Sequence, residues 1–368
     1  MTQLREAAAG GTVVMINISG WRCDALLVSE VGVNVKELPD LTQAATVERV
    51  NTYLDALREF QSSSEDPATA RDVMEREIAA TLEWLWESIA EPVLDALGHH
   101  RLPADDQWPR LWWCPMGPLA ILPLHAAGYH SEPGHHSVLD RVISSYTPTL
   151  RALSAARSRP QPTSPGRLLL IAQPYTPGAP PLPAARLEQG FLASQFDDTQ
   201  LTLLTDVDAT HAGIRNKLAT HAQVHAACHG HQDLHDPTSG GLLPHDWNRA
   251  GLLSVLDLAA SEHAGGEFAF LSACKSATGG ITIMDEAVNL AAALHYAGWR
   301  HVIGTLWSVW DADAAFITRD TYQHLVNESG LDPNRSAEAL HHALRGHRER
   351  PNHRAQPSRW APFLHIGP

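Results

Sequence analysis

The feature that most constrains the fold is an alternation of short apolar runs with amphipathic runs in the second half of the chain. Strand–helix–strand repeats of this kind give parallel strand pairing, so the pattern predicts a mostly parallel sheet covered by helices on both faces. Sheets of this type place their chemistry at the carboxyl ends of the strands. The strand-like runs cover residues 167–172, 201–205, 223–227, 267–273 and 300–306, and the helical runs lie around residues 184–195, 209–219, 284–297 and 311–327.

The first half of the chain has a different pattern. Two short β-like runs, residues 12–19 and 23–29, precede two long stretches with helical spacing, residues 41–60 and 67–97, the second with a kink expected at Pro92. The Pro/Ser-rich stretch "RSRPQPTSPG" then reads as a linker. We therefore predict an N-terminal lobe over residues 1–156, with short strands, two long helices and a Pro/Gly-rich segment. A catalytic α/β domain is predicted over residues 167–368.

Charge, cysteine content and apolar runs indicate which partners and which cellular compartment to expect. The sequence has 27 Lys and Arg against 41 Asp and Glu, a formal net charge of −14, which argues against nucleic acid and anionic membranes as partners. The four cysteines are far apart and form no CxxC pair, so a disulfide framework is not expected. No apolar run reaches the roughly 18 residues of a membrane helix, and no signal peptide is evident. We expect a cytoplasmic protein.

Two predicted strand ends carry reactive side chains. Cys228, His229 and Gly230 follow the strand at 223–227, and Cys274 follows the strand at 267–273. A cysteine at the exit of a buried strand suits a nucleophile, because its thiolate can attack a carbonyl and its own N–H can help to stabilise the oxyanion. A histidine on the neighbouring strand end can lower the pKa of such a thiol from about 8.5 to between roughly 3.5 and 7.5. His229 fits this role, and Gly230 lets a substrate approach closely.

Two other interpretations of these residues stay open. A strand-end cysteine is often a small buried hydrophobe. Alternatively, several of the side chains could bind zinc, although neighbours in a strand point in opposite directions and no matching Cys/His pair recurs downstream. The possible zinc ligands are His225, Cys228, His229, His231 and His235. We expect no metal and no cofactor. We expect a structural role for His225 within the strand, and solvated loop positions for His231 and His235.

Several longer segments resemble one known family. "HAACHG", "FAFLSACKSATGG" and "DEAVNLAAALHYAGWRHVIGTLWSVWDADA" follow one another in the order and spacing of the CHAT domain, and "WWCPMGPLAILPLHAAG" and "RWAPFLHIG" resemble its flanking segments. The likeness runs from about residue 75 to 367. It implies a caspase-like three-layer α/β/α sandwich, a relationship to separases, and cysteine endopeptidase (thiol protease) activity. Matched residue by residue, the family's catalytic pair falls on His229 and Cys274.

The resemblance also suggests a mechanism and a specificity. The N–H groups of Gly230 and Cys274 would form the oxyanion hole, and "GTLWSVWDAD" is similar to a region of separases, which cleave after arginine. Asp311, Asp313 and Trp307 are therefore candidate substrate-binding residues, although Asp311 could instead cap a helix and Trp307 could pack in the core.

The expected partners are a protein substrate, cleaved at few sites, and a regulatory protein, in a defence or cell-death-like pathway. A catalytically silent interaction module and a zinc-dependent hydrolase are the alternative functions.

Overall fold

The chain forms two compact units, described by a computed structural model. The description covers residues 7–63, 66–104, 107–131, 134–160, 166–231, 240–260, 266–272, 291, 294–295, 297–328 and 330–368. Within these ranges, the first unit holds the residues up to 154 and residues 345–361, and the second holds residues 155–272, 291–344 and 362–368. The division of the sequence at residues 156 and 167 stays a prediction.

The first unit contains five sheet strands in the order β3-β2-β1-β4-β5. β1 pairs antiparallel with β2, which pairs antiparallel with β3, whereas β4 is parallel to both β1 and β5. Val13, Val28 and Trp112 from three of these strands pack into one apolar cluster. The strands are β1 (Thr12–Asn17), β2 (Asp24–Ser29), β3 (Gly32–Glu37), β4 (Arg110–Pro115) and β5 (Ile143–Tyr146).

Two long helices of this unit begin at residues that cap them. The Thr42 side chain accepts a hydrogen bond from the N–H of Ala45 at the start of α2, and that of Asp66 accepts one from Thr69 at the start of α3. A π-helical turn interrupts the second helical stretch just upstream of Pro92, and the chain continues from this turn directly into α4, with Pro92 in the first turn of α4. The helices are α2 (Gln43–Ser62), α3 (Pro67–Leu85), the π-turn Trp86–Ala90, α4 (Glu91–Ala96) and α5 (Leu150–Ser158), with short 3₁₀ turns at Gly117–Ile121, Leu124–Ala126 and Val138–Asp140.

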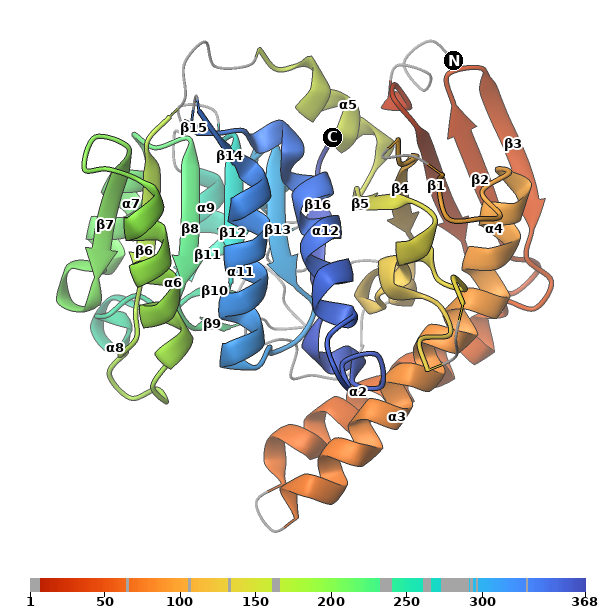
Figure 1. Cartoon of the computed structure of the whole chain (residues 1–368), viewed down its shortest axis with the longest axis horizontal. Helices are drawn as coiled ribbons and strands as arrows, with labels where there is room; N and C mark the ends of the chain where they lie inside the picture. Colours follow the sequence, from red (N-terminus) through yellow and green to blue (C-terminus); the bar gives the residue numbers. More distant parts are fainter. Residues whose placement is uncertain are drawn as a thin grey trace. The chain divides into compact units, whose positions relative to one another are not determined.

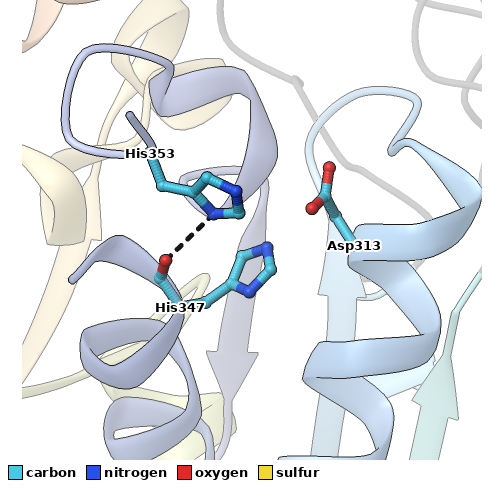
Figure 2. Close-up of side chains that lie close together, drawn as sticks. All are labelled: Asp313, His347 and His353. Carbon is cyan, nitrogen blue, oxygen red and sulfur yellow. Dashed lines mark hydrogen bonds between the residues drawn. The ribbon is translucent and has the colours of Figure 1, made fainter. Parts of the chain in front are cut away.

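A buried ion pair ties residues 345–361 to the rest of the first unit. Arg348 Nη2 donates to Asp140 Oδ1 at 2.5 Å, and Arg348 Nη1 donates to the Ser137 hydroxyl at 2.9 Å. Both charged side chains are almost fully buried. Close by in sequence, His353 Nδ1 donates to the His347 carbonyl at 3.0 Å (Figure 2).

The second unit contains the parallel sheet that the alternating sequence pattern predicts. Its order is β16-β13-β12-β8-β6-β7, and every pair is parallel except β13 with β16. All residues of β6, β8, β12 and β13 are buried, as expected for strands covered on both faces. The strands are β6 (Leu168–Ala172), β7 (Leu201–Thr205), β8 (Gln223–Ala227), β12 (Phe268–Leu271), β13 (His301–Thr305) and β16 (Phe363–Ile366).

Helices lie on both sides of this sheet. α6 (Pro183–Gln195) and α11 (Asp311–Leu325) pack side by side in front of it, and α9 (Val255–Ala260) lies behind it (Figure 1). This arrangement confirms the predicted α/β/α fold class. None of the helices in the described ranges is long and apolar enough to cross a membrane.

Most of the predicted helix at 284–297 lies outside the described residues. The remaining elements of the described ranges are short helices and strands, together with the longer α12. These elements are α7 (His211–Leu218), α8 (Trp247–Ala250), α12 (Ser336–Arg348), β9 (Gly230–His231), β10 (Gly241–Leu242), β11 (Leu253–Ser254), β14 (Val326–Asn327) and β15 (Gly330–Leu331), with 3₁₀ turns at Asp206–Asp208, Pro333–Arg335 and Pro357–Arg359.

Replacing Asp140 by asparagine should destabilise the first unit in a pH-dependent way. Burial alone would raise the pKa of Asp140, but the hydrogen bonds and charge of Arg348, with the hydroxyl of Ser137, outweigh it and lower the pKa to about 2. A carboxyl whose pKa is depressed in the folded state stabilises the fold above its unfolded pKa of about 3.9, and this stability is lost as the pH falls toward about 2.

We therefore expect Asp140→Asn to lower the free energy of unfolding by about 3 kcal/mol at neutral pH. Denaturant titration at several pH values should show the gap narrowing below about pH 4. Asp55→Asn is the control, since Asp55 pairs with Arg58 on the exposed face of α2 and should change stability little. A gap that does not depend on pH would contradict this account of the ion pair.

Candidate active site

A cavity of about 190 Å³ opens where two strands of the second unit end. Its walls come from the loop that leads into α6, the first turns of α6, the ends of β8 and β12, and the segment that leads into α11. The polar side chains on these walls are His229, Ser272, Ser308, Glu188 and Asp311, and no lysine or arginine is among the described lining residues. The ionisable side chains among the described lining residues are therefore two carboxyl groups and one imidazole.

The orientation of His229 is fixed by a backbone carbonyl. His229 follows the last residues of β8, and its Nε2 lies 2.7 Å from the carbonyl oxygen of Pro180. A carbonyl only accepts hydrogen bonds, so Nε2 carries a proton. In the neutral ring, Nδ1 is then the nitrogen with a free lone pair. The side chain is 6% exposed, which suits a group that works in a cleft.

The loop that supplies this carbonyl is held in place by its own hydrogen bonds. Trp247 Nε1 donates to the Pro177 carbonyl at 2.7 Å, and the N–H of Leu182 donates to the Pro174 carbonyl at 2.9 Å. Three prolines near Pro180 further restrict the backbone. The loop thus presents a fixed acceptor to the imidazole.

Glu188 is the most deeply buried charged group on the cavity wall. It lies on α6 with 2% of its surface exposed. Its carboxylate accepts from Ser272 Oγ at 2.7 Å and from Thr318 Oγ1 at 2.8 Å, and it also bonds to Nε2 of His225 at 2.8 Å. His225 is fully buried within β8, so it acts in the interior network and not as a second histidine of the cavity.

Asp311 is a second carboxylate on the wall, and its ionised form is disfavoured. Burial raises the pKa of Asp311 and so does the nearby charge of Glu188, while the N–H of Ala184 and the His229 ring act in the opposite direction. The net result is a raised pKa. A carboxyl that is costly to ionise, yet lies in a cleft beside a histidine, is a candidate for ligand binding.

The other predicted specificity residues lie elsewhere in the fold. Trp307 and Asp313 are 2% and 3% exposed, and neither lines the cavity. α11 begins at Asp311 itself, and its N-cap position is held by Trp310 without a side-chain hydrogen bond, so Asp311 does not cap the helix. Of the three candidates, only Asp311 faces the cavity.

Of the predicted catalytic pair, His229 lies within the described residues and Cys274 does not. Gly230 starts β9 and pairs with Leu242 of β10, directly after His229. Cys274 lies outside the described residues, so its pairing with His229 and its part in an oxyanion hole stay predictions. Ser272, two positions earlier in the chain, follows the end of β12 and lies on the cavity wall.

The described residues that were possible zinc ligands do not form a metal-binding site. Among the described residues, His225, Cys228, His229 and His231 form no group whose ligand atoms could share a metal ion. Cys228 is fully buried. His235 lies outside the described residues.

Two features of the site carry no clear signal in the sequence. Glu188 has the spacing of an ordinary helical residue, and the acceptor at Pro180 is a backbone atom, which no residue type reveals. A glutamate on the buried side of an amphipathic helix is the one available hint for Glu188, because charged residues are rarely buried without a partner.

Comparison with protein families matches a family model, described as the CHAT domain, to residues 79–368, which is most of the chain. The chain belongs to the CHAT domain family. No curated protein matches the sequence of this CHAT protein.

Solved structures show the same fold at low sequence identity. A chain of the Saccharomyces cerevisiae separase–securin complex is similar over 100% of the CHAT protein and 31% of its own length, with a TM-score of 0.66 and 11% identity. The CHAT protein thus spans about a third of that chain. The RgpB pro- and mature-domain complex of Porphyromonas gingivalis is less similar, with a TM-score of 0.46 and 11% identity over 87% of the CHAT protein and 75% of that chain. The fold is the caspase-like one expected from the sequence.

Substituting Asp311 by asparagine should stabilise the CHAT protein at neutral pH. Because burial and Glu188 raise the pKa of Asp311, its ionised form costs folding free energy above that pKa, and the cost disappears at lower pH, where the carboxyl is protonated in both folded and unfolded states. Asp311→Asn should therefore raise the melting temperature at pH 7, and the difference should shrink toward pH 3.

Asp320→Asn serves as the control, because Asp320 lies on the same helix but does not line the cavity. Its melting temperature should follow that of the wild type at each pH. A lower melting temperature for Asp311→Asn at pH 7 would show that the carboxylate stabilises the fold.

Proposed function

We propose that this chain is a cysteine endopeptidase in which Cys274 is the nucleophile and His229 is the acid–base partner. The observation that carries the proposal is the position of His229. Its ring is oriented by the Pro180 carbonyl and faces a cavity whose wall includes Ser272, only two positions before Cys274 in the chain. Membership of the CHAT domain family and the caspase-like fold support the same chemistry.

The reaction follows from these groups. The Cys274 thiolate attacks the scissile carbonyl carbon, and the N–H groups of Gly230 and Cys274 stabilise the oxyanion that forms. His229 gives a proton to the leaving amine, so the peptide bond breaks and an acyl-enzyme remains. Water then attacks the thioester, and the acid product and the free thiol are released.

A basic side chain before the scissile bond suits the cavity. Asp311 brings a carboxylate to its wall, and no described lining residue brings a positive charge. Glu188 also lies on the wall, but its carboxylate is held by Ser272, Thr318 and His225. The Ser308 hydroxyl, which is buried and has no hydrogen-bond partner among the described residues, adds a polar group. A guanidinium or an ammonium would favour the ionised form of Asp311 and remove the cost of burying it.

We infer a protein substrate that is cleaved at few sites in the cytoplasm, in a regulated defence or cell-death-like pathway. The similar chain of the separase–securin complex was solved with a protein partner, which supports a regulatory partner here as well.

Covalent labelling provides the first test. A peptide with a C-terminal arginine chloromethyl ketone should modify Cys274 in the wild type, whereas His229→Ala should slow labelling strongly and Cys274→Ala should abolish it. The remaining cysteines are an internal control, since Cys23, Cys114 and Cys228 are buried and burial raises the pKa of Cys114 to about 12. Mass spectrometry of tryptic peptides locates the adduct. A Cys274 that stays unmodified with every peptide tried would favour a silent interaction module.

Cleavage specificity provides the second test. In a peptide library, the wild type should cleave after Arg or Lys, and Asp311→Asn should lose at least about tenfold in kcat/KM for these sites, equivalent to one charge-assisted hydrogen bond. Asp313→Asn is the matched control and should keep the preference, because Asp313 does not line the cavity. Cleavage after acidic or small residues by the wild type would rule out the proposed basic pocket.

A further inference from the structure

We propose that Glu188 is a positioning residue which holds the ends of β8 and β12, the two strands that lead to His229 and Cys274, in their working arrangement. This inference rests on the proposed peptidase function and adds a residue that neither the family resemblance nor the sequence motifs indicated. It depends on the hydrogen bonds of one buried carboxylate.

The carboxylate of Glu188 joins three other elements to α6. Ser272, just past the end of β12, donates to Oε1, while Thr318 of α11 and His225 of β8 both bond to Oε2. On its other side, His225 Nδ1 lies 3.1 Å from the hydroxyl of Tyr322, also on α11. One side chain therefore connects two neighbouring strands and the helix pair that covers them.

The protons in this network have one consistent arrangement. Burial raises the pKa of Tyr322 well above its usual value, so its hydroxyl stays protonated and can donate to Nδ1 of His225. Nε2 of His225 then carries a proton and donates to Glu188. With donors also from Ser272 and Thr318, every group that faces the carboxylate is a donor.

The connected residues lie immediately before the catalytic positions. His225 precedes His229 by four positions, and Ser272 precedes Cys274 by two. β8 and β12 are parallel neighbours, with Phe270 opposite His225, so the carboxylate is bonded to the middle of β8 and to the residue just past the end of β12. A misplacement of about 1 Å in a reacting group can cost about a hundredfold in rate, so a brace between these two strands would matter for catalysis.

Stability alone does not account for a glutamate here. Buried ionic groups are commonly no better for stability than well-packed apolar residues of similar size. Ser272, Thr318 and His225 occupy three of the roughly four lone-pair sites of the Glu188 carboxylate. Most of its hydrogen-bonding capacity is thus directed at the strands and at α11, and little is left for a substrate.

The test compares Glu188→Gln with Glu267→Gln. Glutamine keeps the shape of Glu188 but places an NH₂ group against hydroxyl and imidazole donors, so the brace is lost while the volume is kept. Glu267 is the matched control because it is also buried, pairs with Arg300 at 2.9 Å, and lies at the opposite end of β12. Both variants are expected to lower the melting temperature.

Two readouts separate positioning from stability, measured at a temperature where circular dichroism shows each variant folded. Glu188→Gln should reduce the alkylation rate of Cys274 by iodoacetamide about tenfold or more, and should reduce kcat for a cleaved peptide by a similar factor while KM changes less than about twofold. Glu267→Gln should change neither. Ser272→Ala, which removes one hydroxyl and is the milder change, should reduce both rates in the same direction.

The possible results lead to distinct conclusions. If the wild type cleaves peptides and Glu188→Gln and Ser272→Ala react at the wild-type rate, the positioning role is wrong while the peptidase function stands. If Glu267→Gln loses as much as Glu188→Gln, the losses reflect stability, and the positioning role is again wrong. If Cys274 of the wild type is no more reactive than an ordinary thiol, the peptidase function fails and this role with it.

Discussion

The parallel pairing of β8 with β6 and β12 is the constraint on which the site depends. Parallel strands end at the same edge of a sheet, so whatever follows them is brought together even when it is far apart in the sequence. Ala227 and Leu271 end two of these strands, and His229 and Ser272 follow on the wall of one cavity. The position of the cavity is therefore decided by strand order, and its chemistry by the few residues after each strand.

The charges of the second unit are distributed unevenly between the two ends of the strands. At the amino end of β12, Glu267 has a full ionic partner in Arg300. At the carboxyl end, Glu188 is bound by hydroxyl groups and an imidazole, and burial raises the pKa of Asp311. Natural proteins tolerate such unfavourable charge at sites of function and hold their stability elsewhere. The raised pKa of Asp311 at the carboxyl end supports the proposal that the cavity binds a ligand with positive charge.

The sequence alone predicted much of the sheet and part of the site. Short runs rich in apolar residues predicted β7 and β8 with their observed bounds, although only β8 is buried throughout and β7 lies at the sheet edge. β3 was missed: Val33 and Val35 alternate with polar residues, but most of its short length is exposed at the sheet edge. Asp313 and Trp307 were predicted in the pocket because "GTLWSVWDAD" resembles a separase segment, but Asp313 is buried on α11 and Trp307 is buried in the segment before that helix. The position of Cys274 stays a prediction from its motif.

A carbonyl partner for His229 has a chemical consequence. In a serine enzyme the histidine must remove a proton from a very weakly acidic hydroxyl, and a carboxylate behind the ring stabilises the imidazolium that results. A thiol is far more acidic, so a cysteine enzyme needs the imidazole mainly to be oriented correctly and to protonate the leaving group. The neutral Pro180 carbonyl fixes the ring and the site of its proton without adding another negative charge to the cavity. The proposed mechanism therefore needs no third charged catalytic residue, which leaves Asp311 for the proposed binding role and Glu188 for the proposed positioning role.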